Sequence, residues 1–253
     1  MASASSTFSG FAFFTLVYFI IKYFVGKNPN SSKSVMILMA IYIIIVMLMA
    51  YGSNVQSIKQ MCGEPYFGLA LMATIVPWTF IFGILNVALI MMPGWKAPFS
   101  NTFGYLLVKM NGIQGVFNDI FKAKMGKITI NKASNLDNAL EKIYSDKSLL
   151  INELTPANFE AFWTNFKPLF KADAGSYKEK LYNMIRMKDL VSEFIWYLLV
   201  GLIVTTLSSN YIIGMGCNPS LKSIEKNQDK WSKNQMDKQA KAAEPPKVYI
   251  HRD

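Results

Sequence analysis

Hydrophobic residues are concentrated in four blocks of the chain, and the sequence between these blocks is polar. A bilayer with a hydrocarbon core of about 30 Å is crossed by a helix of about 20 mostly apolar residues. The blocks predict transmembrane helices at residues 10–26, 35–52, 66–92 and 190–216. The first block is the shortest and contains Lys22, whose position near the end of the block allows its ammonium group to reach the lipid headgroups.

Two local features refine these predicted helices. No Lys or Arg precedes the first block and no small-residue cleavage site follows it, so we interpret it as a retained helix rather than a signal peptide. Pro77 lies inside the third block, where it removes a backbone hydrogen bond and is expected to distort the helix.

The predicted helices divide the chain into a membrane region at 1–92, an extramembrane domain at 93–189, a fourth span at 190–216 and a tail at 217–253. The 93–189 segment is polar and long enough for a small folded domain. Its apolar residues recur at helical spacing, so we expect a mostly helical domain. The fold class is therefore mainly α: a helical membrane protein with about four transmembrane helices, a small helical extramembrane domain and an extended tail.

One helix of this domain is predicted to begin at Thr155, which is followed by proline as at many helix starts. Its aromatic residues follow helical spacing and have two interpretations. They form the core of the domain, which we favour, or they form a partner-binding surface. These residues are Phe159, Phe162, Trp163 and Phe166. The next helix is expected to run without a break into the fourth span.

The segment Pro93-Gly-Trp-Lys-Ala-Pro-Phe-Ser-Asn-Thr-Phe-Gly-Tyr105 follows the third span. Its two prolines and two glycines predict that it is not a continuous helix. Its aromatic residues are typical of membrane interfaces. We interpret the segment either as an ordinary membrane-exit turn or as a rigid elbow that docks the domain against lipid or a neighbouring protein. The candidate contact residues are Pro93, Gly94, Trp95, Pro98, Phe99, Ser100, Asn101, Gly104 and Tyr105.

The chain has a formal net charge of +10, and the tail contributes eight Lys and Arg against five Asp and Glu. The tail contains few large apolar residues, so we expect it to be extended and to fold only on a partner. Lys247 and Tyr249 are its candidate partner-binding residues. Basic flanks are expected beside membrane helices for lipid attraction alone, so nucleic-acid contact by the tail is the less favoured alternative.

Four crossings place the chain's N-terminus and tail on one membrane face, and the 93–189 domain on the other. The distribution of Lys and Arg favours a cytoplasmic domain. Cys62 and Cys217 then lie on the tail side, either as a disulfide in an oxidising compartment or as two free thiols. Asn30 begins an Asn-Ser-Ser glycosylation sequon, which this orientation keeps away from the lumen.

The sequence contains few residues or motifs that are suited to catalysis. Its single histidine, His251, is the third residue from the end of the sequence, and no His/Cys cluster or glycine-rich phosphate loop is found. We therefore expect no enzyme activity, no cofactor, no metal and no small-molecule substrate. Polar residues within the spans are interpreted as hydrogen-bonding contacts between helices. These are Asn86, Thr205, Thr206 and Asn210.

The sequence PGWKAPFSNTFGY at 93–105, following two apolar spans, resembles multi-pass inner-membrane proteins (transmembrane minor capsid proteins) of large icosahedral double-stranded DNA viruses. The resemblance covers these thirteen residues and the layout of hydrophobic blocks. It implies a structural virion protein that anchors the internal lipid membrane to the capsid. Its expected partners are the bilayer and capsid or other minor capsid proteins. Its expected location is the virion internal membrane and, during assembly, a host-derived membrane such as the endoplasmic reticulum. The alternatives are a viroporin-like channel and a membrane-embedded assembly factor.

Overall fold

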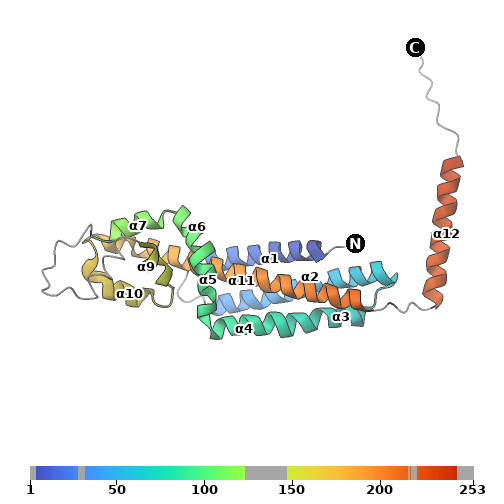
Figure 1. Cartoon of the computed structure of the whole chain (residues 1–253), viewed down its shortest axis with the longest axis horizontal. Helices are drawn as coiled ribbons and strands as arrows, with labels where there is room; N and C mark the ends of the chain where they lie inside the picture. The colour runs from blue at the N-terminus through green and yellow to red at the C-terminus, as the bar shows by residue number, and fades with distance from the viewer. Residues whose placement is uncertain (1–3, 28–31, 123–146, 216, 218–220, 244–253) are drawn as a thin grey trace, which may run out of the picture.

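The computed structural model describes residues 4–27, 32–122, 147–215, 217 and 221–243. In this described part the regular elements are helices, and one isolated bridge joins Phe121 to Phe170. A long bundle of apolar helices forms the centre of the molecule, with a helical domain at one end and a separate helix at the other (Figure 1).

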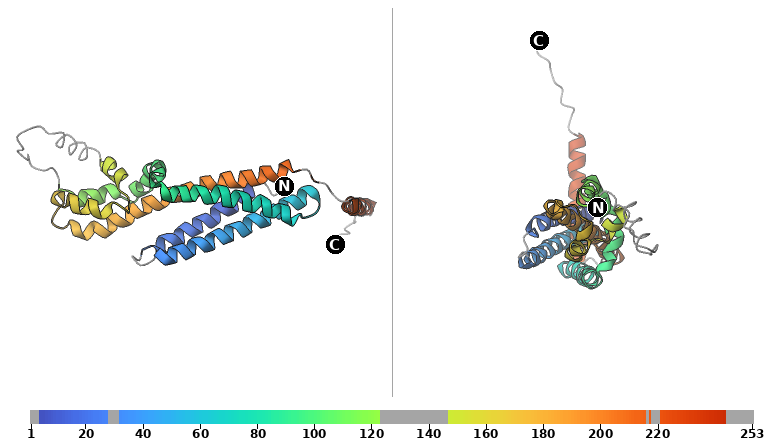
Figure 2. Two further views of the ribbon diagram at one scale, coloured as in Figure 1. Left: turned by 90° about the horizontal axis from the view of Figure 1, so that it is seen from below. Right: turned by 90° about the vertical axis from the view of Figure 1, so that its left-hand side faces the viewer.

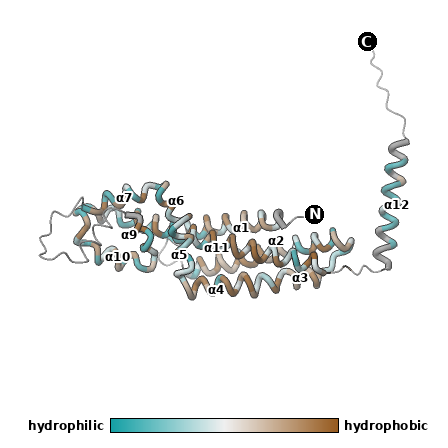
Figure 3. The backbone as a smooth tube through the Cα atoms, viewed as in Figure 1, coloured by the Kyte–Doolittle hydropathy of each residue, from teal (hydrophilic) through white to brown (hydrophobic). Residues whose placement is uncertain are grey.

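The four predicted spans are confirmed as helices that are long and apolar enough to cross a membrane. They are α1 (Ala4–Val25), α2 (Ser32–Cys62), the combined helix Phe67–Met91, and the apolar half of α11 (Lys178–Gly214). In Figure 3 the apolar residues are concentrated along this bundle. Many of its large side chains face outwards, and Ile90 is 72% exposed. This outward apolar surface is expected of helices whose solvent is lipid rather than water.

The third span changes helix type at Pro77. It consists of α3 (Phe67–Val76), the π-helix η1 (Pro77–Gly83) and α4 (Ile84–Met91). Proline has no amide hydrogen and its ring crowds the preceding turn of an α-helix, which the wider π turn accommodates. The predicted distortion is therefore a change of hydrogen-bonding pattern within one continuous span.

Aromatic rings fill the interior of the bundle. The rings of Tyr18 and Tyr42 stack with their centroids 4.3 Å apart, and the ring of Phe11 lies 5.6 Å from that of Trp78. The close approach of α1 and α11 depends on Gly201, because a Cβ atom at that position would lie 1.9 Å from Cε1 of Phe11. Small residues at contacts between membrane helices commonly serve this purpose.

The extramembrane domain packs several short helices around the first turns of α11. They are α6 (Tyr105–Met110), α7 (Ile113–Ile120), α9 (Lys147–Glu153), α10 (Phe159–Phe166), η4 (Lys167–Leu169) and η5 (Ala174–Tyr177). Their apolar faces form one core with α11. Because α11 continues from this core into the membrane, the predicted run of one helix through both regions is confirmed.

The aromatic residues of α10 belong mainly to this core. Phe159 and Phe162 are buried, which confirms the favoured interpretation as core residues and corrects the alternative that they bind a partner. Trp163 and Phe166 are half-buried against the same core. The helix begins at Phe159 and not directly after Thr155. The intervening turn is closed by side-chain bonds, since Asn158 Oδ1 accepts the Thr155 amide at 2.8 Å and the Asn158 amide donates to Thr155 Oγ1.

The elbow segment is more helical than predicted. The chain leaves the third span at Met92, and helical turns of changing type follow: η2 (Pro93–Lys96), α5 (Ala97–Phe99), the π-helix η3 (Ser100–Gly104), and then α6. Pro93 and Pro98 lie in the first turns of η2 and α5. An amide hydrogen at these positions has no acceptor within the helix, so proline costs no helical hydrogen bond there. The prolines therefore start new helical turns.

The tail also departs from the prediction, because residues 221–243 form the helix α12 (Leu221–Ala243) and are not extended. Its Lys, Gln, Ala and Glu residues have favourable helix propensities, and Asp229 and Lys233 have the spacing of a favourable ion pair on a helix. The helix runs across the long axis of the bundle (Figures 1 and 2). Lys247 and Tyr249 lie outside the described residues.

Candidate functional site

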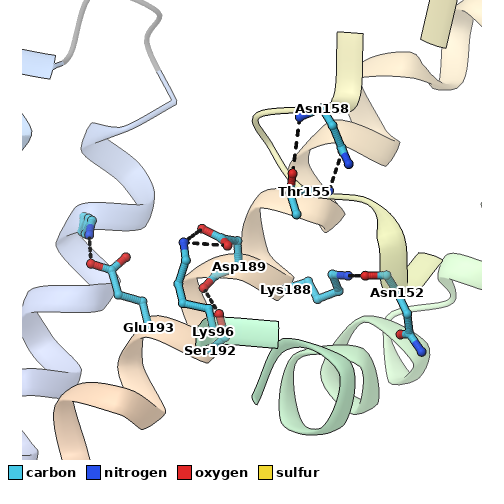
Figure 4. Close-up of polar contacts among 9 residues, drawn as sticks. Lys96, Asn152, Thr155, Asn158, Lys188, Asp189, Ser192 and Glu193 are labelled. Atoms are coloured by element: carbon cyan, nitrogen blue, oxygen red, sulfur yellow. Dashed lines mark hydrogen bonds and ion pairs between the residues drawn. The ribbon is translucent and has the colours of Figure 1, made fainter. Parts of the chain in front are cut away.

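The boundary between domain and bundle is marked by a cluster of charged side chains on α11. Arg186, Lys188, Asp189 and Glu193 lie within about two helical turns of one another. Arg186 and Glu193 contact α1, Asp189 contacts the elbow and Lys188 contacts α9. Figure 4 shows the contacts of Lys188, Asp189 and Glu193. We call these four residues and their bonded partners the junction.

The first junction contact joins α1 to α11. Lys22 Nζ lies 2.5 Å from Glu193 Oε1, and both side chains are largely shielded from solvent. The sequence predicts that Lys22 lies near the end of a span with its ammonium group at the lipid headgroups, whereas the structure pairs it with Glu193. Arg186 adds a second tie to α1, because its Nη2 donates to the carbonyl oxygen of Tyr23. The pairing lowers the cost of placing charge at the edge of the hydrocarbon region.

The second junction contact joins the elbow to α11. Lys96 Nζ lies 2.8 Å from both carboxylate oxygens of Asp189 (Figure 4). A hydrogen bond between ionised groups is stronger than one between neutral groups. This pair therefore holds the first turn after the third span against the helix that forms the fourth.

The third junction contact joins α9 to α11. The Lys188 side chain is 1% exposed, and its Nζ donates to the carbonyl oxygens of Ile151 at 2.7 Å and Asn152 at 3.0 Å. These carbonyls belong to the last turn of α9, where backbone acceptors lack partners within the helix. Burial lowers the pKa of Lys188 to about 8, against the carboxylates of Asp189 and Glu153, which raise it.

The elbow packs closely on α11, so only some of its candidate contact residues face outwards. Ser100 and Gly104 are buried. The ring of Trp196 on α11 lies 5.7 Å from that of Trp95 and 6.3 Å from that of Phe99. The half-buried members of the candidate set are Phe99, Asn101 and Tyr105, and the exposed members are Pro93, Gly94, Trp95 and Pro98. The exposed members remain candidates for contact with another molecule.

A polar node joins three helices deeper in the bundle. Asn54 Nδ2 donates to Thr74 Oγ1 and to Ser208 Oγ, each at 2.8 Å, and Ser208 Oγ donates to the carbonyl oxygen of Ala73. Sequence reasoning missed these residues. The signal available was an amide side chain at Asn54 in the uncharged sequence that continues the second block.

The residues predicted to form hydrogen bonds between helices bond within their own helices or lie on the bundle surface. Asn86, Thr205 and Thr206 donate to carbonyl oxygens of their own helices, and Asn210 is exposed on the bundle surface. Their assignment as interhelical contacts is therefore wrong for the bonds of the described residues. A short polar side chain on a helix satisfies itself on the preceding turn when no partner faces it.

Cys62 and Cys217 form a disulfide, with their Cα atoms 5.4 Å apart. The bond joins the end of α2 to the residue that follows α11 and precedes α12. Disulfides persist in oxidising compartments. The bond therefore predicts that the tail face of the membrane is the oxidising side and that the helical domain is cytoplasmic, the orientation that the distribution of basic residues also favours.

The arrangement is suited to holding helices together, because the junction charges bond to one another or to backbone carbonyls. In the part of the chain that the structure describes, no group of three His, Cys, Asp or Glu residues could hold a metal ion. No family model, curated protein or solved structure matches this chain.

Proposed function

We propose that this protein is a structural membrane protein that anchors a lipid bilayer to a neighbouring protein layer. In the virus family that residues 93–105 resemble, the bilayer is the internal virion membrane and the protein layer is the capsid shell. The observation that carries the proposal is the continuity of α11, which contributes to the core of the domain and to the fourth span without a linker between them.

This continuity supports a mechanical role. The 37 residues of α11 extend over about 55 Å at 1.5 Å per residue. The contacts Lys22–Glu193 and Lys96–Asp189, with the bonds from Lys188 to α9, hold neighbouring elements to its middle. A force applied to the domain is therefore passed to the bundle, since no unstructured hinge separates them.

The opposite membrane face carries a second surface for protein contact. The disulfide holds the chain just before α12 to the end of α2. Trp231 is 65% exposed on α12, and the neighbouring side chains of Lys230 and Lys233 are also exposed. Many weak contacts of this kind, repeated over a lattice, supply avidity without a single strong interface.

The proposal is tested by mild detergent extraction of particles or membranes that carry the protein layer. We expect the wild-type protein to stay with the layer after the lipid is removed. A variant with a four-residue Gly-Ser insertion after Asp189 interrupts α11, and we expect the layer to retain its domain less well. The matched control places the same insertion after Lys33, away from α11. Release of the wild-type protein together with the lipid would refute the proposal.

A further inference from the structure

A groove of about 670 Å³ opens on the membrane-facing surface at the domain end of the bundle. It lies between the last turns of α1, the elbow with α6, and the start of the membrane part of α11. Its walls are almost entirely apolar. The residues that line it include Leu16, Ile20, Phe24, Phe103, Leu106 and Phe194. Its size is within the range of about 300–1,000 Å³ that is typical of ligand sites.

The position of the groove matches one leaflet of a bilayer. The lining residues on α1 run from Leu16 to Phe24, which corresponds to about 12 Å of helix. One leaflet of the hydrocarbon core is about 15 Å thick. Asn111, directly after α6, is the polar residue of the lining and lies at the domain end. The groove is therefore apolar over the depth of one acyl chain.

Positive charge gathers at the headgroup end of the groove. Tyr23 lines the groove, and its ring lies 5.5 Å from Lys27 Nζ and 5.1 Å from Arg186 Cζ. Lys22 is neutralised by Glu193, whereas no carboxylate forms an ion pair with Lys27 or Arg186 among the described residues. Two cations without a carboxylate partner therefore lie at this end of the groove: Lys27, which is exposed, and Arg186, which is largely buried and donates to the carbonyl oxygen of Tyr23.

We propose that this groove binds one acyl chain of an anionic phospholipid, whose phosphate lies beside Lys27 and Arg186. Apolar walls of one-leaflet depth with cations at headgroup level are complementary to that ligand. A helix from a partner protein fits less well, because it is about 10 Å wide with its side chains. The proposal is independent of the anchoring function.

The test uses the full chain purified in mild detergent and mixed with phosphatidylglycerol or with phosphatidylcholine of the same acyl chains. Bound lipid is counted by native mass spectrometry. We expect one phosphatidylglycerol to be retained, with a preference of about tenfold over phosphatidylcholine. Lys27→Glu should remove this preference, whereas Lys33→Glu, an exposed lysine on the same membrane face, should leave it unchanged.

A second pair of variants tests the apolar walls. Ile20→Trp fills the groove and should abolish retention of both lipids. Ile44→Trp adds the same side chain to an exposed position on α2 outside the groove and should have no effect. Equal retention of the two lipids by the wild-type protein would overturn the assigned headgroup, and full retention by Ile20→Trp would overturn the assigned site.

A measurement on the wild-type protein keeps the test valid if a variant fails to fold. Phosphatidylglycerol with a photoactivatable acyl chain should label peptides from α1 and α6. Labelling spread evenly over the exposed face of α2 would contradict a specific site. Crosslinking of these peptides to another protein in native membranes, without lipid labelling, would assign the groove to a partner helix and refute the proposal.

Discussion

Gly104 lies directly against the backbone of Lys188. A Cβ atom at position 104 would be 2.5 Å from the carbonyl oxygen of Lys188 and 2.9 Å from its Cγ. This contact brings the elbow onto α11 at the level where Lys188 bonds to α9. The elbow and the buried lysine are therefore parts of one packed junction.

Replacing Gly104 by alanine should open this contact. The added methyl group meets backbone, which cannot move aside as the end of a side chain can, so we expect a loss of about 1–3 kcal/mol in the free energy of unfolding. The melting temperature of the purified chain measures it. Gly94→Ala is the matched control, since a Cβ atom there has nothing within 4 Å. Equal melting temperatures for the two variants would contradict the prediction.

The polar node predicts a modest effect for Asn54→Leu. Thr74 and Ser208 keep backbone acceptors for their hydroxyl groups, so the substitution removes two interhelical bonds without leaving these donors unsatisfied. We expect a loss of about 0.6–1.7 kcal/mol, as for other hydrogen bonds between membrane helices. Unfolding in mixed detergents measures the loss. Asn210→Leu, at an exposed position, should cost less, and a larger cost there would argue against the node.

The ion pair between Lys96 and Asp189 should contribute more than an exposed pair. Asp189→Asn weakens two charge-assisted hydrogen bonds in a site that is 21% exposed, and we expect a loss of about 1.5–3 kcal/mol. Glu160→Gln affects a pair with Lys178 in which the Glu160 side chain is 72% exposed, and it should change stability by less than about 1 kcal/mol. Thermal melting compares the two, and the reverse order would refute this ranking.

Lys188 should make stability depend on pH. Its pKa is about 8 in the folded protein against an ordinary value of 10.5, so between these values the unfolded chain binds more protons than the folded chain. Raising the pH through this window therefore favours the folded state, and below pH 8 the full cost of burying the charge is present.

Comparison with Lys188→Met isolates this effect, because the other titratable groups contribute to both proteins. The melting temperature of the wild-type protein should rise relative to that of the variant between about pH 7.5 and about pH 9.5. A constant difference across this range would show that Lys188 titrates with an ordinary pKa.

The disulfide between Cys62 and Cys217 predicts the orientation of the chain. The bond predicts a tail on the oxidising, lumenal side. Met236→Thr creates an Asn-Gln-Thr glycosylation acceptor at Asn234 on α12, which this orientation predicts to be modified in microsomes. The natural acceptor at Asn30 should stay unmodified on the other face. Gel mobility before and after glycosidase treatment measures both, and modification of Asn30 would reverse the assigned orientation.

The elbow shows which structural features local sequence patterns can predict and which they cannot. Its prolines and glycines indicated a break after the third span, and the break occurs at Met92. They did not indicate that Pro93 and Pro98 begin new helical turns, or that Gly104 meets another helix. A proline disrupts a helix when it lies in the interior, but it is compatible with the first turn of a helix. Only the path of the chain distinguishes the two cases.

The long apolar blocks were sufficient to establish the four membrane helices, because a helix satisfies the backbone groups of a single segment in lipid. The helical spacing of apolar residues was sufficient to establish the helical domain. Packing decided which polar side chains meet. Asn54 and Asn86 both carry an amide side chain in an uncharged stretch of the sequence, yet of the two only Asn54 bonds to other helices. That choice depends on how each helix is rotated and which neighbour lies at its side, and these are properties of the assembled bundle.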